Sequence, residues 1–230
     1  MEAIILAGGL GTRLNSRLTD RPKAMAVVAD QPFLKILLDR LIDTGCGRVI
    51  LSVGHLRHVI IEAFQQSYRG IPIEYAVEEK PLGTGGAIRL ALQHVEESSA
   101  FILNGDTYLD ADFPAMLACH RSCGRPMTMA VAPVQNIARY GGVEIEADQV
   151  SSFIEKGRQG PGWINAGCYV LCKNFPWPHG LPAQFSFETD VLAQALPSIR
   201  PAAFRCQGYF LDIGIPEDLD RAQIELADRK

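Results

Sequence analysis

Three glycines and two basic residues near the N-terminus form the most informative chemical pattern in the sequence. Gly8, Gly9 and Gly11 lie within four positions, and Arg13 and Lys23 follow them. Glycine lets backbone amides approach a bulky anion closely, and the two cations add fixed positive charge. The pattern predicts a phosphate-binding loop. It is neither a P-loop nor a dinucleotide fingerprint, because the Lys-Ser/Thr pair and the Gly-x-Gly-x-x-Gly spacing are both missing, which disfavours a dehydrogenase.

Two aspartates far apart in the chain each follow an apolar stretch. Asp106 stands in Asn104-Gly105-Asp106-Thr107, directly after residues 100–104, and Asp212 ends the apolar run 209–212. Asp106 alone would also suit a turn cap. Two carboxylates that meet at the end of a sheet can hold one Mg²⁺, which takes few protein ligands and keeps phosphate and water in its shell. The pattern therefore allows a cation site at Asp106 and Asp212 if the fold brings them together.

The elements that must position these groups alternate in the first half of the chain. Apolar runs predict strands at 2–7, 48–53, 73–77 and 100–104, and helical spacing predicts helices at 33–44, 56–68 and 85–95. This alternation indicates an α/β fold with a doubly wound parallel sheet, whose strand ends form the ligand crevice. The second half predicts short strands at 127–133, 142–145, 150–154 and 166–171, and helices at 186–196 and 216–228. We expect one domain, 1–230.

Composition narrows the class of protein. The 230 residues are 47% hydrophobic with a formal net charge of −4, so a nucleic-acid-binding basic face is not expected. No apolar run nears the roughly 20 residues that span a bilayer, and no signal peptide is apparent, so a cytoplasmic protein without membrane contact is expected. The six cysteines are expected to be reduced. Cys119, His120 and Cys123 have a faint zinc-like spacing, but a helix carrying two thiols is favoured.

The glycine loop, Thr12-Arg13-Leu14 and Pro22-Lys23 resemble the signature of the sugar-phosphate nucleotidyltransferases, in six ordered motifs from residue 3 to about 218. The resemblance implies a Rossmann-like, GT-A-like mixed sheet, with a nucleotide-binding half (1–112) and a sugar-phosphate-binding half (113–230). It implies transfer of a nucleoside monophosphate from an NTP to a sugar 1-phosphate, with release of pyrophosphate. One departure is Ala24, where many relatives have a second proline.

Roles come with the resemblance, residue by residue. Arg13, Lys23, Asp106 and Lys156 would be catalytic, and Asp106 and Asp212 would hold Mg²⁺. The nucleotide would contact Leu6, Gly8, Gly9, Gly11, Thr12, Arg13, Glu78, Gly83 and Thr84. Within that set, Arg13 and the loop amides would take the leaving pyrophosphate, Lys23 would lie near the α-phosphate, Gly83 would let the base pack on the backbone, and Thr84 would bind it. The sugar phosphate would contact Gly142, Glu155, Lys156 and Asn165, in the motifs Tyr-Gly-Gly-Val, Glu-Lys and Ile-Asn-Ala-Gly.

Glu78 predicts which base is bound. It stands five residues before Gly83, where a pyrimidine-reading relative has Gln. A carboxylate accepts two hydrogen bonds side by side, which matches the N1–H and N2–H₂ donors of guanine and not the edge of uracil or thymine. GTP is therefore the favoured donor. The alternative is a solvated loop charge.

The identity of the sugar 1-phosphate that accepts the nucleotidyl group is predicted from resemblance alone. The short chain, Glu-x-x-Pro-Leu-Gly-Thr-Gly-Gly-Ala and Asp-Ile-Gly-x-Pro-Glu-Asp most resemble the guanylyltransferases of D-glycero-α-D-manno-heptose 1-phosphate, which serve surface-polysaccharide synthesis. Mannose 1-phosphate guanylyltransferase, and uridylyl or thymidylyl transfer to a hexose 1-phosphate, are the alternatives. A regulator without catalysis is disfavoured because Arg13, Lys23, Asp106 and Asp212 are all present. A homodimer is left open.

Overall fold

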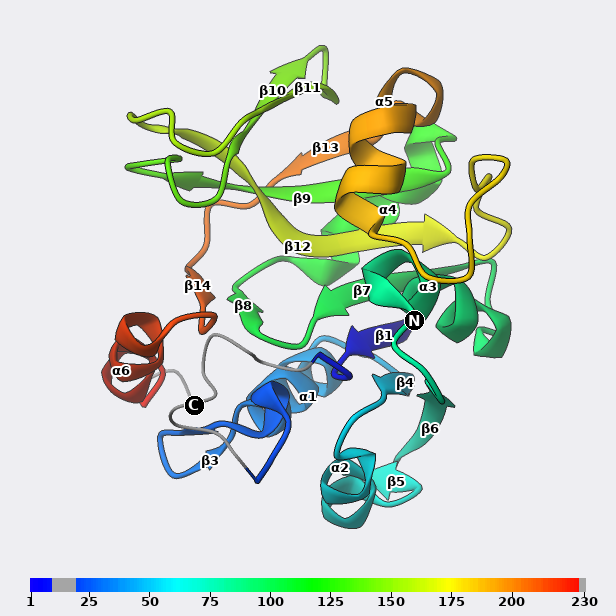
Figure 1. Ribbon diagram of the computed structural model, residues 1–230, viewed down its shortest axis with the longest axis vertical. Coiled ribbons are helices and arrows are strands. Elements are labelled where there is room, and N and C mark those ends of the chain that lie inside the picture. Colours follow the sequence, from blue (N-terminus) through cyan, green and yellow to red (C-terminus); the bar gives the residue numbers. More distant parts are fainter. Residues whose placement is uncertain (10–19, 228–230) are drawn as a thin grey trace.

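A mixed β-sheet forms the centre of the molecule (Figure 1). The computed structural model describes residues 1–9 and 20–227. Within these ranges ten strands follow the order β10-β11-β13-β9-β12-β7-β1-β4-β6-β5. Their bounds are β1 Glu2–Leu6, β4 Arg48–Val53, β5 Ser67–Tyr68, β6 Ile71–Val77, β7 Ser99–Asn104, β9 Met127–Val134, β10 Gly142–Glu146, β11 Gln149–Ile154, β12 Gly162–Cys172 and β13 Ala202–Arg205.

The strands β7, β1, β4 and β6 run parallel, and this block creates the ligand crevice. Ile4 of β1 pairs with Ile50 of β4 on one side and with Ile102 of β7 on the other. The chain moves outward from β1 through β4 to β6 and then returns to place β7 on the opposite side of β1. This reversal is a topological switch point, where ligands bind beyond the carboxyl ends of parallel strands. The expectation of a doubly wound mixed sheet is confirmed.

Helices cover both faces because apolar residues of the strands alternate in direction. Ile5 packs into one buried cluster with Phe33 of α1, whereas Ile4 packs into a second cluster with Ile88 of α3 and Leu196 of α5. The helices are α1 Phe33–Asp43, α2 Arg57–Phe64, α3 Gly83–Ala91, α4 Phe113–Cys123, α5 Ala193–Ile199 and α6 Pro216–Glu225, with 3₁₀ turns at Lys23–Met25 and Leu92–His94 and a π-turn (η4) at Phe187–Leu192.

Two small strand pairs lie outside the main sheet. One joins β2 (Val27–Val28) to β3 (Gln31–Pro32), and the other joins β14 (Phe210–Asp212) to β8 (Thr107–Leu109). In the second pair Asp212 lies opposite Thr107, and the Ile213 amide donates to the carbonyl of Asp106 at 2.9 Å. This pairing brings the two aspartates of the sequence motifs together.

Several of the predicted helices have other bounds in the structure. The helix predicted at 56–68 ends at Phe64, because Gln65 takes a positive φ of 50° and a turn at Arg69 and Gly70 (φ 48° and 85°) pairs β5 with β6. The helix predicted at 186–196 begins as the π-turn and continues to Ile199. The helix predicted at 216–228 runs from Pro216 to Glu225, and residues 226 and 227 are no longer helical.

The cysteines form no disulfide bond in the structure. Cys119 and Cys123 both lie on α4, all six cysteines are free, and residues 1–9 and 20–227 contain no group of three His, Cys, Asp or Glu side chains able to hold a metal. None of the helices in these ranges has the length and apolar content to cross a membrane.

Gly105 follows β7 and packs against the end of β1. A Cβ added there would lie 2.5 Å from the Leu6 carbonyl oxygen, which is backbone and cannot move away easily. We predict that Gly105→Ala lowers the free energy of unfolding by about 2–3 kcal/mol, as overpacking does. Urea denaturation measures this. The control is Gly47→Ala, where an added Cβ meets nothing within 4 Å. Equal stability of the two variants would contradict the packing argument.

Candidate active site

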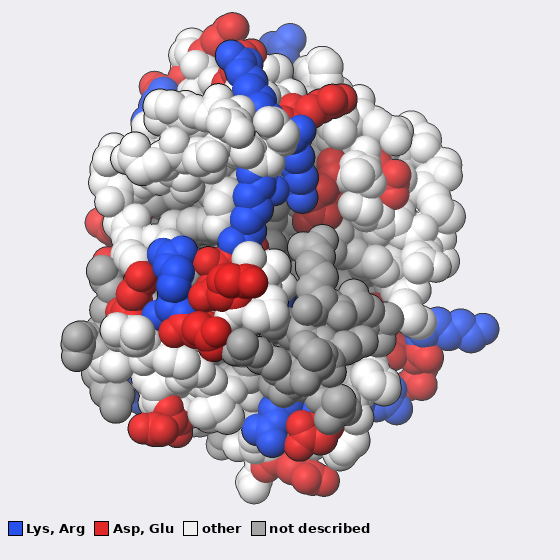
Figure 2. Space-filling model, turned by 60° about the vertical axis from the view of Figure 1, so that its left-hand side comes forward, with Lys and Arg blue, Asp and Glu red and all other residues white. Residues whose placement is uncertain are grey.

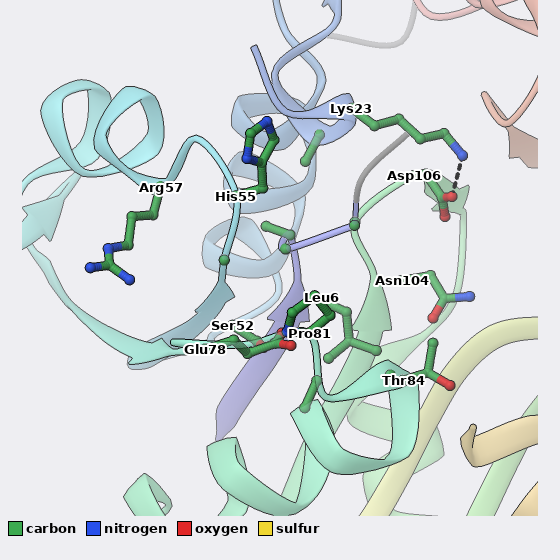
Figure 3. Close-up of a pocket in the computed structure, with 18 of the residues that line it drawn as sticks. Leu6, Lys23, Ser52, His55, Arg57, Glu78, Pro81, Thr84, Asn104 and Asp106 are labelled. Atoms are coloured by element: carbon green, nitrogen blue, oxygen red, sulfur yellow. Dashed lines mark hydrogen bonds and ion pairs between the residues drawn. The ribbon is translucent and has the colours of Figure 1, made fainter. Parts of the chain in front are cut away.

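One cavity of about 700 Å³ lies where the parallel strands end (Figure 3). Its walls come from the residues that directly follow each strand: Gly8 and Gly9 after β1, Gly54 after β4, Glu78 after β6 and Asp106 after β7. Leu6, Gly83 and Thr84 also line it. The structure therefore brings most of the predicted nucleotide residues into one cavity. Gly11, Thr12 and Arg13 lie outside the described residues.

Lys23 and Asp106 form an ion pair at one end of this cavity (Figure 3). The lysine begins the 3₁₀ turn Lys23–Met25, which Pro22 starts by accepting a 2.8 Å hydrogen bond from the Met25 amide. The two side chains are 16% and 33% exposed, so the pair is shielded on one side and reachable from the other.

Asp212 completes a cluster of charges with this pair. Its Oδ1 accepts a 2.6 Å hydrogen bond from the Gly214 amide. A Cβ added to Gly214 would lie 2.7 Å from that Oδ1 and 3.3 Å from Lys23 Nζ, so the ammonium also lies beside Asp212. Burial raises the pKa of Asp212, and the charge of Asp106 acts in the same direction. Two carboxylates thus meet beside the Lys23 ammonium, and Arg139 adds a second cation on the Asp212 side.

The donor set of this cluster fits a hard divalent cation. The Lys23 ammonium already occupies a position beside two carboxylates, which is the charge arrangement that Mg²⁺ requires. Magnesium needs no more than one or two protein carboxylates when phosphates and water supply the rest of its shell. The residues present therefore fit the predicted Mg²⁺ site.

Glu78 is held against the cavity wall. Its Oε1 accepts a hydrogen bond from Ser52 Oγ at 3.3 Å, and its Oε2 accepts one from the Leu82 amide at 2.9 Å. There is little room for a side chain at Gly8, because an added Cβ would lie 3.0 Å from Glu78 Oε1 and 3.1 Å from the Gly54 nitrogen. A carboxylate has about four acceptor positions, so a fixed Glu78 can still accept from a ligand.

The glycines at the start of α3 pack against another segment of the protein, residues 183–185. Gly83 has a φ of +69°, and a Cβ there would lie 2.5 Å from the carbonyl oxygen of Phe185. Thr84 Oγ1 donates to Glu188 Oε2 at 2.6 Å and accepts from the Phe187 amide at 2.8 Å. Its hydroxyl proton is therefore used within the protein, and any contact of Thr84 with a base has to use its remaining lone pair.

The predicted sugar-side residues divide into two places. Asn165 on β12 donates to Tyr169 Oη at 2.7 Å and accepts from the Gly167 amide at 3.0 Å. Gly167 has a φ of +66° and packs on Asn104, which lines the cavity. Asn165 is therefore linked through Gly167 to Asn104 of the cavity wall.

Gly142, Glu155 and Lys156 lie together at the end of the β10–β11 hairpin. Gly142 pairs with Ile154, and Glu155 and Lys156 follow directly as exposed residues. None of the three lines the 700 Å³ cavity.

Basic side chains run in a column down one face of the molecule, beside a hollow, with acidic side chains at its lower end (Figure 2).

Several residues near the site were not predicted. Ser52, Asn104 and Gln184 line the cavity, and Arg139 Nη2 lies 3.5 Å from Asp212 Oδ2. Ser52 and Asn104 lie at strand ends, so the rule that identified Asp106 could have found them. Arg139 and Glu188 carried no comparable signal in the sequence.

Asp212 gives a prediction with a definite sign. Because its pKa is raised, the folded protein binds this proton more tightly than the unfolded chain, so stability falls as pH rises above the ordinary value of 3.8. We predict that Asp212→Asn raises the free energy of unfolding at pH 7, in chelator, by about 0.5–1 kcal/mol while abolishing turnover. The gain should vanish at pH 3. Lower stability at pH 7 would contradict the charge arrangement. Chemical denaturation at both pH values measures it.

Comparison with known proteins identifies close relatives. The chain is 41% identical over 226 residues to the D-glycero-alpha-D-manno-heptose 1-phosphate guanylyltransferase of Aneurinibacillus thermoaerophilus, with 98% of each chain covered. It is 42% identical over 219 residues to the protein of the same name from Campylobacter jejuni, covering 95% of this chain and 96% of the relative.

Solved structures and a family model agree with these relatives. The crystal structure of HddC from Yersinia pseudotuberculosis has a TM-score of 0.83 and 38% identity, covering 96% of this chain and 97% of the other, and it has also been solved in complex with GMP-PN. The family model described as Nucleotidyl transferase matches residues 2–229. The fold and family expected from the motifs are confirmed, and the chain belongs to the nucleotidyl transferase family.

Proposed function

We propose that this enzyme transfers GMP from GTP to D-glycero-α-D-manno-heptose 1-phosphate, giving GDP-heptose and pyrophosphate. Two relatives of nearly equal length, 41% and 42% identical, carry this activity in their names. The observation that supports it best is one cavity with Glu78 in its wall and the Lys23, Asp106 and Asp212 cluster at one end. Its volume lies in the range of about 300–1,000 Å³ that suits a nucleotide-sized ligand.

The reaction needs positioning and neutralisation of charge more than proton transfer. An oxygen of the sugar phosphate attacks the α-phosphorus of GTP, the new P–O bond forms, and the bond to the bridging oxygen breaks, so that pyrophosphate leaves with its electron pair. That attacking oxygen is already ionised at pH 7, and no general base is required. Catalysis of this kind rests on in-line alignment and on fixed positive charge.

Lys23 supplies such a charge at the end of the cavity. Its ammonium is directed by the Lys23–Met25 turn toward Asp106 (Figure 3), and we assign it to the α-phosphate. Gly8 and Gly9 line the same cavity, and their backbone amides are assigned to the nucleotide phosphates, with Arg13 taking the pyrophosphate. Asp106 and Asp212 would hold Mg²⁺, which supplies charge neutralisation at the phosphates when bound.

The sugar side is assigned to the second half of the chain. Lys156 carries a compact positive charge for the incoming phosphate, and Glu155, Gly142 and Asn165 are assigned to the sugar. The 1–112 and 113–230 halves follow from this division. A cytoplasmic location and a homodimer remain predictions.

Guanine selection provides the sharpest single-residue prediction. Glu78→Gln replaces one acceptor with an amide that donates, so it faces the donor edge of guanine with a mismatched group. We expect kcat/KM for GTP to fall about 10- to 100-fold and the preference for GTP over UTP to shrink by a similar factor. Steady-state kinetics with both nucleotides measures the change.

The control for this variant is Ser52→Ala, which removes the 3.3 Å hydrogen bond to Glu78 Oε1 and keeps the carboxylate. It should retain the GTP preference within about threefold. An unchanged GTP-to-UTP ratio in Glu78→Gln would mean that Glu78 is a loop charge that does not contact the base.

The proposed function is tested by pyrophosphate release with Mg²⁺ over a grid of four NTPs and three sugar 1-phosphates: heptose, mannose and glucose. We expect release with GTP and the heptose phosphate at least about tenfold above every other pair. Preference for mannose 1-phosphate would favour the related guanylyltransferase activity. Preference for UTP or dTTP would overturn the base assignment, and no release with any pair would favour a binding protein without catalysis.

A further inference from the structure

The segment 182–188 is fastened to the loop that begins α3. The Phe185 amide donates to the Leu82 carbonyl at 3.0 Å, and the Gly85 amide donates to the Phe185 carbonyl at 3.0 Å. Arg89 Nη2 donates to the Pro182 carbonyl at 3.0 Å, and its guanidinium lies 4.7 Å from the centre of the Phe185 ring. The segment therefore has a fixed position beside the cavity, which its Gln184 lines, and Glu188 ends the segment.

Glu188 is held by one of its two carboxylate oxygens. Oε2 accepts hydrogen bonds from Thr84 Oγ1 at 2.6 Å and from Ser186 Oγ at 3.0 Å. No residue in the described part of the chain donates to Oε1. The side chain is half-buried, and Oε1 is not among the buried side-chain oxygens without a partner, so this oxygen is open to solvent and to a ligand. Such an atom is suited to accept a hydrogen bond from a ligand.

The surroundings of Glu188 connect the nucleotide side to the sugar side. Thr84 lines the cavity. On the other side, Phe187 packs edge-on against Tyr169 with ring centres 5.3 Å apart, and Tyr169 Oη accepts a 2.7 Å hydrogen bond from Asn165. Burial, and after it the charge of Glu188, raises the pKa of Tyr169, which agrees with a carboxylate close to this pair. Glu188 therefore binds Thr84 directly and adjoins Phe187, which packs on the Asn165–Tyr169 pair.

The local backbone also has a form that often accompanies function. Glu188 lies in the first turn of the π-helical segment Phe187–Leu192, and such turns are rare and frequent at functional sites. The turn is held by its own contacts, because the Ser186 amide donates to Asp190 Oδ2 at 2.7 Å and the Thr189 amide donates to Ser186 Oγ at 3.2 Å. The Oε1 atom of Glu188 therefore takes no part in the hydrogen bonds that hold this turn.

We propose that Glu188 is a specificity-determining residue that accepts a hydrogen bond from a hydroxyl of the acceptor sugar through Oε1, while Thr84 and Ser186 fix Oε2. The inference rests on the proposed function and adds a sugar contact to it. A hydroxyl donating to a carboxylate makes a charge-assisted hydrogen bond. A sugar that lacks this hydroxyl, or directs it elsewhere, loses this hydrogen bond, which discriminates between sugars.

The test is Glu188→Gln. The amide carbonyl can still accept from Thr84 and Ser186, which turns the NH₂ group toward the sugar, where an acceptor is needed. We expect KM for the sugar 1-phosphate to rise about 10- to 100-fold and KM for GTP to change less than about threefold. The matched control is Asp190→Asn, which removes an acid from the same turn and should leave KM for the sugar phosphate within about threefold.

A binding measurement without turnover separates this role from bracing of the nucleotide loop. By isothermal titration, Glu188→Gln should bind GDP as the unmodified protein does and bind GDP-heptose at least about tenfold more weakly. Glu188→Asp, which withdraws the carboxylate by one methylene, should show the same pattern if Glu188→Gln does not fold.

Three results would overturn the inference. Unchanged affinity for GDP-heptose in both variants would remove the sugar contact, and an equal loss of GDP and GDP-heptose affinity would mean that Glu188 only braces Thr84. Failure of the unmodified protein to bind GDP-heptose or use any sugar phosphate would reject the proposed function itself, and this is seen before any variant is compared.

Discussion

The mutual arrangement of three charges at the ends of two strands is the constraint on which the rest of the site depends. Asp106 follows β7, Asp212 ends β14, and Lys23 lies beside both. Two carboxylates this close destabilise the protein unless a cation is present, and burial adds to that cost at Asp212. The sheet has to supply the free energy that keeps them together. It does so through the parallel pairing of β7 with β1 and the short β14–β8 pair.

A second constraint concerns the wall opposite this cluster. The glycine-rich start of α3 looks like a feature that makes room for a ligand, but Gly83 leaves space for the backbone of Phe185, and a side chain at Gly86 would meet the Ala183 carbonyl 2.6 Å away. Glycine therefore serves first to let the second half of the chain lie against the nucleotide loop. Because of this contact, Gln184 of the same segment lines the cavity.

The fold and much of the cavity could be predicted from the sequence because the relevant signals are local. Apolar runs defined β1, β4, β6 and β7, and the residues after each run became the walls, as with Glu78 and Asp106. The position of Asp212 beside Asp106 needed family resemblance, since a three-residue strand such as β14 carries little periodicity. The π-turn and Glu188 could not be predicted, because they depend on contacts with Thr84, 104 positions away in the sequence. Glu155 and Lys156 lie apart from the cavity, so their roles remain predictions.

The proposed function depends on one step, the attack of a sugar-phosphate oxygen on the α-phosphorus of GTP at this cluster. The most direct measurement uses heptose 1-phosphate carrying ¹⁸O on its phosphate, with mass spectrometry of both products. The account predicts that the label is recovered entirely in GDP-heptose and that pyrophosphate carries none. Label in pyrophosphate or in inorganic phosphate, or formation of no GDP-sugar at all, would contradict it.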